Sequence, residues 1–247
     1  MIYNYKIKLK NENGTKLDHS SAYKLYAALL EKVPCDYAQA LHAQELTPVS
    51  QHLDITDRNS PIWNISLFGN EACSFFSKSL HENKTISIEN GTWLFEKVGR
   101  TEIKSDLDLL ANAGNLPDTN LYIMKFLSPV TFKSNGEYAL FPSAELIVKS
   151  LVNRLNALSE DVCLNDPDAE KMLVSGVRIS GYSLNSTAYY IKGQRIPSFI
   201  GHVKLTAGLS APMANLWKTL MYFSRFSGVG IKTALGMGGT DFVPILR

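Results

Sequence analysis

The sequence has few cysteines, no metal-ligand pattern and no long apolar run. Its three cysteines, Cys35, Cys73 and Cys163, are odd in number and widely spaced, which predicts reduced thiols rather than a disulfide framework or a zinc site. The apolar runs are far shorter than a membrane span, and residues 1–14 contain no apolar signal core. We therefore expect a cytoplasmic globular protein that contacts no membrane and uses no metal ion and no cofactor.

Residues 228–239, GVGIKTALGMGG, are rich in glycine but fit neither common nucleotide-binding loop. A P-loop needs glycine, lysine and serine or threonine in succession, and Ile231 interrupts that run. The dinucleotide fingerprint needs a third glycine where this chain has Thr233. Both loops also lead from a strand into a helix, whereas here the loop follows a predicted helix at 211–226 and precedes a short strand at 240–246.

Acidic residues are nearly missing from the last third of the chain. Residues 171–247 contain nine Lys or Arg against one acid, Asp241, a net charge of +8, which leaves 16 basic against 22 acidic residues, or −6, for residues 1–170. Aromatic residues are interspersed with these basic residues. Because a basic surface with stacking side chains suits a polyanion, we favour nucleic-acid binding over charges that only keep the protein soluble.

Hydrophobic periodicity predicts an α+β fold with two similar halves. In the first half we expect strands at 2–10, 49–55 and 62–68, helices at 20–31 and 71–81, and a strand pair at 85–98 around the hairpin signal Asn90-Gly91. In the second half we expect strands at 121–129, 173–183, 187–193, 198–206 and 240–246, a hairpin around Asn135-Gly136, and helices at 144–158 and 211–226. Each half reads βαββαβ, which predicts two tandem ferredoxin-like, RRM-like domains with antiparallel sheets, at 1–118 and 119–247.

Four stretches share a pattern with one enzyme family. They are YAQALHAQELTPVS at 37–50, FLSPVTFKSNGEYALFPS at 126–143, IPSFIGHVKLTAG at 196–208 and SRFSGVGIKTALGMGG at 224–239. With these stretches in this order, the chain resembles the CRISPR repeat-processing endoribonucleases of the RAMP superfamily, which cut precursor CRISPR RNA within its repeats. The first stretch is similar to the segment that carries the family's N-terminal histidine, and the last is similar to its C-terminal glycine-rich signature.

The resemblance implies that CRISPR repeat RNA is the partner and that cleavage needs no metal ion. In the family the ribose 2′-OH attacks the adjacent phosphate, which gives a 2′,3′-cyclic phosphate and a 5′-OH end. This reaction needs a base, an acid and a cation for the extra phosphate charge, and imidazole can serve as either acid or base near neutral pH. The sequence leaves open whether the chain forms a homodimer or assembles with other CRISPR-associated subunits.

Two histidines and one tyrosine are the catalytic candidates. His42 matches the family histidine and is the preferred candidate, while His52, on a predicted strand, is its rival. Tyr26 matches a tyrosine that assists catalysis in some members. It also lies on the apolar face of a predicted helix, so a role in the core is equally well supported.

The chain departs from the family pattern just after His42. Some members have a lysine there, whereas this chain has Gln44 and Glu45. The cation would then come from Lys232 or Lys24, or be missing. This departure gives weight to a second hypothesis, a catalytically silent RAMP subunit that scaffolds CRISPR RNA in an interference complex. The candidate histidine and the lack of long inserted segments favour the enzyme.

The resemblance also assigns RNA contacts to the glycine-rich loop. Its glycines would let backbone amides approach a phosphate, with a charge from the lysine and a donor from the threonine. The expected contacts in the loop are Gly228, Gly230, Lys232, Thr233, Gly236, Gly238 and Gly239, and further basic candidates are Lys133, Arg195, Lys204 and Arg225. The alternatives are a packing turn between two sheets for the loop and solvated surface charge for the basic residues.

Overall fold

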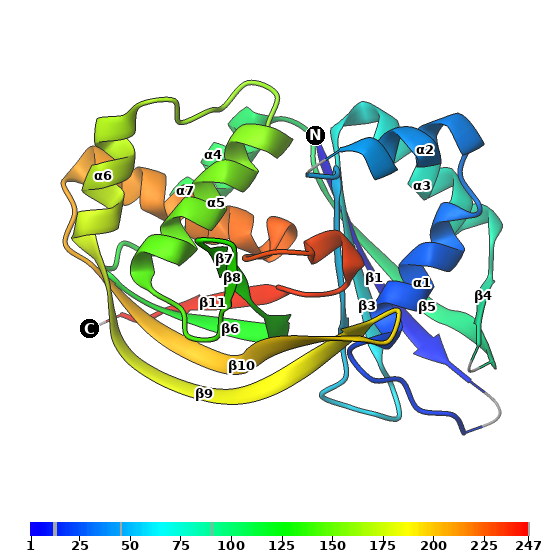
Figure 1. Ribbon diagram of the computed structural model, residues 1–247. Helices are drawn as coiled ribbons and strands as arrows, with labels where there is room; N and C mark the ends of the chain where they lie inside the picture. Colours follow the sequence, from blue (N-terminus) through cyan, green and yellow to red (C-terminus); the bar gives the residue numbers. More distant parts are fainter. Residues whose placement is uncertain (12–13, 45, 90, 247) are drawn as a thin grey trace.

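The computed structural model describes residues 1–11, 14–44, 46–89 and 91–246, without the side chain of His42. Two antiparallel sheets form the two halves of the chain, and helices cover one face of each (Figure 1). In this view the helices of the second half lie above their sheet. Within the described ranges, every helix is too short or too polar to span a bilayer.

The first half contains a five-stranded sheet. Its elements are β1 (Ile2–Lys10), α1 (Ser21–Leu30), α2 (Cys35–Ala43), β2 (Val49–Asp54), β3 (Ile62–Phe68), α3 (Gly69–Glu82), β4 (Thr85–Ile88) and β5 (Gly91–Ile103). The strand order is β2-β3-β1-β5-β4. Along β1, alternate residues Tyr5, Ile7 and Leu9 are buried in one core cluster with Leu25 of α1 and Phe76 of α3, as the period of two in a strand requires.

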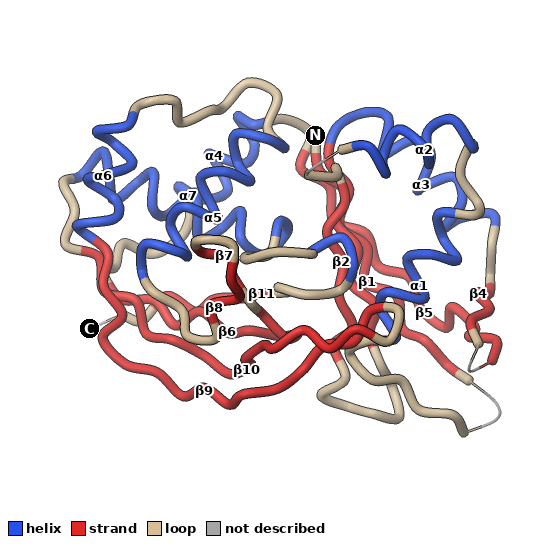
Figure 2. The backbone as a smooth tube through the Cα atoms, viewed as in Figure 1, coloured by secondary structure: helices blue, strands red, loops and turns tan. Residues whose placement is uncertain are grey.

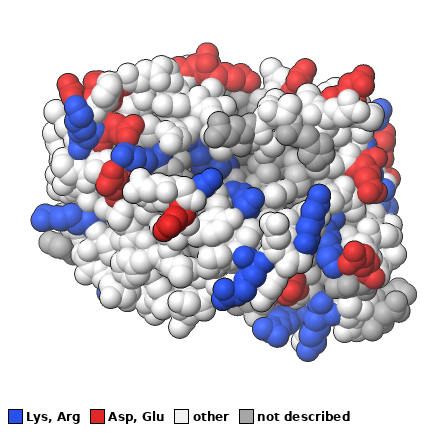
Figure 3. Space-filling view, in the orientation of Figure 1, with Lys and Arg blue, Asp and Glu red and all other residues white. Residues whose placement is uncertain are grey.

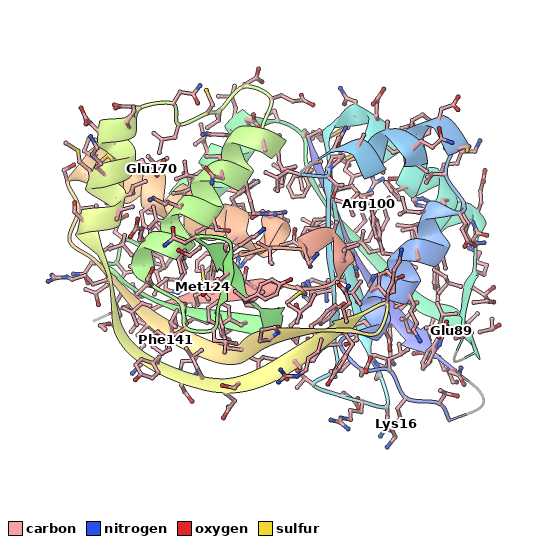
Figure 4. All side chains as sticks on the ribbon, viewed as in Figure 1. Lys16, Glu89, Arg100, Met124, Phe141 and Glu170 are labelled. Atoms are coloured by element: carbon pink, nitrogen blue, oxygen red, sulfur yellow. The ribbon has the colours of Figure 1, made fainter. Side chains whose placement is uncertain are left out.

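The second half contains a four-stranded sheet and a small hairpin. Its elements are α4 (Asp106–Gly114), β6 (Leu121–Val130), β7 (Phe132–Ser134), β8 (Glu137–Ala139), α5 (Ala144–Leu158), α6 (Pro167–Gly176), β9 (Val177–Ile191), β10 (Gln194–Ala207), α7 (Ala211–Ser227), the 3-10 helix η1 (Thr233–Leu235) and β11 (Thr240–Pro244). The sheet order is β11-β6-β10-β9. Met124 of β6 lies in the core between this sheet and its helices (Figure 4). In both sheets the first strand lies between two later ones: β1 between β3 and β5, and β6 between β10 and β11.

The mixed α/β class with antiparallel sheets is confirmed. The four predicted helices are α1, α3, α5 and α7. Both predicted hairpins are present, since β4 pairs with β5 and β7 with β8, although Asn90 itself lies outside the described residues. Three further helices, α2, α4 and α6, were not predicted.

The prediction for 173–193 was wrong in two respects. Residues 173–176 end helix α6, which starts after Asp166, whose side chain accepts a bond from the Asp168 amide, with Pro167 in the first turn. The two strands predicted at 173–183 and 187–193 are one strand, β9, because β10 pairs along its whole length. The turn instead falls at Lys192-Gly193, where both residues have positive φ.

The two halves pack against each other. Ile2, Phe68 and Ile103 of the first sheet belong to the core cluster of the second half, and the rings of Phe68 and Phe223 lie edge to face at 5.8 Å. The long hairpin of β9 and β10 also curves under the second half and reaches the first (Figure 2). The interface between the two halves, called the seam below, therefore combines apolar packing around Phe68 and Phe223 with contacts at the tip of the hairpin.

Candidate functional site

The glycine-rich loop lies in the seam between the halves. It leaves α7 at Gly228, forms η1 and returns to the second sheet as β11, and in Figure 1 it is the red segment that extends toward the first half. A Cβ on Gly236 would lie 2.6 Å from the Cβ of Ala22 in α1. A Cβ on Gly239 would collide with the ring of His52 in β2. The loop therefore contacts both a helix and a strand of the first half.

The amides of the loop glycines are already used within the protein. Gly230 donates to Ser150 Oγ at 2.8 Å and Gly239 to Ser128 Oγ at 2.9 Å. The amides of Gly228, Gly236 and Gly238 donate to the carbonyl oxygens of Ser224, Thr233 and Pro129. Four of the five glycines also have positive φ, and all five lie against neighbouring atoms that leave no room for a Cβ. This geometry favours the packing alternative for the glycines over direct phosphate binding by their amides.

Lys232 is the exposed charge of the loop. Its backbone is left-handed, with φ 58° and ψ 33°, a strained conformation for a residue with a side chain. Its carbonyl oxygen accepts bonds from the amides of Leu235 and Met237, which ties it to η1. In the described part of the chain no acid pairs with its ammonium group. Thr233, by contrast, is buried, and its methyl group lies beside Gly228 and Gly238.

Tyr26 lies on α1 and is buried in the first core, with its ring stacked on Phe76 at 6.4 Å. Burial raises the pKa of its hydroxyl, the nearby Tyr37 raises it further, and a hydrogen bond with the Thr47 side chain opposes them. The hydroxyl is therefore protonated at neutral pH. Through Thr47 it reaches the segment that directly follows α2.

The two candidate histidines lie on different elements. His42 is near the end of α2, and its side chain lies outside the described part of the structure. His52, on β2, is 7% exposed, and its Nε2 has no hydrogen-bond partner among the residues that the structure describes. Burial lowers the pKa of His52 to about 4, so its ring is neutral at pH 7. With Gly239 against it, His52 has the surroundings of a packing residue.

Sequence reasoning missed Gln51, which lies next to His52. Its side chain is 1% exposed, and Nε2 donates to the carbonyl oxygens of Ala22 at 3.1 Å and Ala234 at 3.0 Å. Its Oε1 accepts a bond of 2.8 Å from Nε1 of Trp63. One amide thus links β2, α1 and η1. The available signal was a polar residue at an inward strand position between Val49 and Leu53.

The tip of the β9–β10 hairpin completes the seam. The amide of Tyr190 donates to Ser20 Oγ at 3.0 Å, and the Tyr189 hydroxyl donates to the Leu235 carbonyl oxygen at 2.6 Å. Beside the tip, a cavity of about 760 Å³ is lined by Lys24 and Lys192, among others.

The candidate cations differ in their surroundings. Lys24 is paired with Glu89, which lies beside α1 at the outer side of the first half (Figure 4). Arg225 donates from Nε to Asp241 at 2.7 Å and lies over the ring of Phe242, so its guanidinium is used within the fold. The exposed candidates without an acidic partner among the described residues are Lys133, Arg195, Lys204 and Lys232. Figure 3 shows several Lys and Arg side chains across the middle and lower part of this face, with acids along its upper edge and on both sides.

Comparison with known proteins gives consistent matches. A family model described as CRISPR-associated endoribonuclease Cas6 matches residues 124–240. The chain is 29% identical over 228 residues to the protein of that name from Streptococcus thermophilus, covering 91% of this chain and 93% of that protein. It is 28% identical over 226 residues to the one from Mycobacterium tuberculosis, covering 90% and 71%.

Solved structures share the fold over almost the whole chain. Thermus thermophilus Cas6 superimposes with a TM-score of 0.75 at 20% identity, covering 98% of both chains. A structure described as a Cas6 product complex gives a TM-score of 0.80 at 18% identity, covering 98% of this chain and all of the other. The arrangement of two sheets with an intervening seam is therefore common to these proteins.

Proposed function

We propose that this chain, which is similar to the Cas6 endoribonucleases, cleaves precursor CRISPR RNA within the repeats to release guide RNAs. The reaction we propose is attack of a ribose 2′-OH on the adjacent phosphate, without a metal ion, in the cytoplasm where the precursor is transcribed. The observation that carries the proposal is the glycine-rich loop beside α1, which exposes Lys232 with no acidic partner among the described residues.

We assign the acid–base step to His42. The surroundings of His52 support this choice, because a neutral ring packed against Gly239 with a pKa near 4 is poorly placed to exchange protons with RNA. Tyr26 would act with His42 through its protonated hydroxyl, which reaches the segment after α2. Lys232 would supply the cation that offsets the developing phosphate charge, since Lys24 is already paired with Glu89.

The RNA would be held by exposed basic side chains rather than by glycine amides. Lys133, Arg195, Lys204 and Lys232 are the contacts we retain. The glycines of the loop shape it, and Arg225 supports the neighbouring strand β11 through Asp241. We also propose that residues 1–118 and 119–247 are two ferredoxin-like domains, which the matching strand arrangement of the two sheets supports.

The test is cleavage of the cognate repeat RNA in excess EDTA by the wild type and by His42→Ala, His52→Ala and Lys232→Ala proteins. We expect cleavage in EDTA, loss with His42→Ala and a 10- to 100-fold fall with Lys232→Ala. A 2′-deoxyribose at the scissile position should also abolish cleavage. If only His52→Ala abolished it, the histidine assignment would be wrong. Tight binding without cleavage by the wild type would instead support an RNA-scaffolding subunit.

A further inference from the structure

We propose that Gln51 is a positioning residue that fixes the glycine-rich loop against α1 and so sets where Lys232 lies relative to the first half. The structure joins three segments through this one side chain, as its bonds to Ala22, Ala234 and Trp63 show. The effect on cleavage rests on the function proposed above, whereas the effect on the loop does not.

The orientation of the Gln51 amide is fixed by its partners. The indole N–H of Trp63 can only donate, so it must face the amide oxygen. The amide nitrogen then faces Ala22 and Ala234, whose carbonyl oxygens can only accept. Both hydrogens of the nitrogen and the oxygen are therefore used, and a flipped amide would place like groups together at all three contacts.

The loop is held at two consecutive carbonyl groups by opposite halves of the protein. Ala234 accepts from Gln51 of the first sheet, and Leu235 accepts from the hydroxyl of Tyr189 in the second. Tyr189 and the loop belong to the same half, so the Tyr189 bond relates the loop to α1 only indirectly, through the bond of the Tyr190 amide to Ser20 just before α1. The Gln51 bonds connect the loop to α1 directly. Gly236, whose missing Cβ lets Ala22 approach, brings the two surfaces close enough for them to form.

A displacement at Ala234 would be passed on to Lys232. The Lys232 carbonyl oxygen accepts from the amides of Leu235 and Met237, and its own backbone is left-handed. These constraints tie Lys232 to η1. Because Gln51 is almost completely buried, loss of its amide would leave two carbonyl groups without this donor in a site that excludes water.

The test compares Gln51→Met, which keeps the length of the side chain but removes the amide, with Gln51→Glu, whose carboxylate faces two carbonyl oxygens. Single-turnover cleavage at saturating protein should fall at least tenfold in both. Asn156→Met is the matched control, because the Asn156 amide also makes two bonds to a remote backbone residue, Leu164, within the second half. That control should change cleavage less than twofold.

A double-mutant cycle separates positioning from general destabilisation. If Gln51 acts through Lys232, Gln51→Met should cost less than twofold in a protein that already carries Lys232→Ala. In a Lys204→Ala background it should retain its full tenfold effect. Equal effects in both backgrounds would show that Gln51 does not act through Lys232 and would overturn the proposal.

Hydrogen exchange of the loop amides tests the proposal without measuring RNA cleavage. Gln51→Met should speed exchange at Leu235, Gly236 and Met237 at least tenfold, while Asn156→Met should not. Unchanged exchange would overturn the proposal. Trp63→Phe, which removes the bond that orients the amide together with part of a fully buried indole ring, should shift exchange in the same direction and gives a second variant for the case in which Gln51→Met folds poorly. If the wild type did not cleave repeat RNA, the proposed function would be refuted. The exchange result would still test whether Gln51 fixes the glycine-rich loop against α1.

Discussion

Gly238→Ala tests whether the glycine-rich loop is built for packing or for direct phosphate binding. Gly238 has φ +75°, and a Cβ there would collide with the carbonyl oxygen of Val229 and lie 2.9 Å from the methyl carbon of Thr233. The Gly238 amide donates to Pro129 at 3.0 Å, and its carbonyl oxygen accepts from the Val229 amide at 2.9 Å. An added methyl group therefore forces Gly238 away from Val229, to which it is hydrogen-bonded across the loop, and from Pro129 on β6.

The expected loss of stability follows from two terms. A left-handed conformation costs an L-residue about 1–2 kcal/mol. Moving Gly238 away from Val229 weakens the two hydrogen bonds of Gly238, to Val229 and to Pro129, which are worth about 1 kcal/mol each. The sum is about 3–4 kcal/mol, which for a chain of this size corresponds to a fall in Tm of about 10 °C.

Gly136→Ala is the matched control. Gly136 has φ +84°, but no atom lies within 4 Å of its would-be Cβ, so only the conformational term applies. Its Tm should fall by about 3–6 °C, which thermal unfolding followed by circular dichroism resolves from the larger shift. RNA binding is then measured well below both transitions. An equal fall in the two variants, or an unchanged Tm with lost RNA affinity for Gly238→Ala, would refute the packing argument.

Three further substitutions test the electrostatics of buried groups by denaturant unfolding. His52→Leu should make the free energy of unfolding less sensitive to acid. The pKa of His52 is about 4 in the folded protein and about 6.5 in the unfolded chain, so the wild type loses up to about 3 kcal/mol of stability as pH falls through that window. An identical pH profile for the variant would contradict this. Asp106→Asn should cost about 2 kcal/mol at pH 7, because its Oδ2 accepts from the Ser159 hydroxyl and three backbone amides. Burial raises the pKa of Asp106 and those bonds lower it, with a net lowering in the folded protein. The stability that Asp106 contributes is therefore present above its unfolded pKa and is lost as pH falls through its folded pKa. If Asp106→Asn left the loss of stability at low pH unchanged, this argument would be wrong. Arg154→Met should raise the free energy of unfolding by about 1 kcal/mol. Burial lowers the pKa of the Arg154 guanidinium to about 10, and no acid pairs with it in the described part of the chain. A less stable variant would contradict this and show that the buried charge has a stabilising partner.

The elements that sequence reasoning found are those with strong local signals. The helices α1, α3, α5 and α7 have ten or more residues and a clear apolar face, and Asn-Gly marks both tight hairpins. The missed helices α2 and α4 have only nine residues, which is too short for periodicity to outweigh competing patterns. The ten-residue α6 runs directly into β9, and its last residues were assigned to that strand. In β9 the middle residues are mostly exposed and polar, so the sequence resembled a loop there, while pairing with β10 kept the strand continuous.

The candidate site was predictable as a loop but not as a set of contacts. A glycine-rich segment indicates that its backbone lies close to other atoms of the protein or of a ligand. What it approaches here is distant in sequence: Gly230 lies against Thr131, and Gly236 lies against Ala22 and Tyr189. Gln51 was missed for the same reason. Its partners Ala22 and Ala234 are 29 and 183 residues away, and no spacing rule connects one strand glutamine with a helix and a loop.

Charge pairing narrows the polyanion surface that composition alone suggested. Of the basic residues after position 170, Lys171, Lys218 and Arg225 are paired with acids, and two of those acids, Asp168 and Asp118, lie outside that segment. The unpaired cations in the described part of this segment are Arg178, Lys192, Arg195, Lys204 and Lys232. Four of them are on the β9–β10 hairpin and the fifth is in the glycine-rich loop. Because the hairpin tip contacts Ser20, just before α1, and the loop contacts Ala22 at the start of α1, an RNA that followed these charges would be led to the seam, where α1 begins.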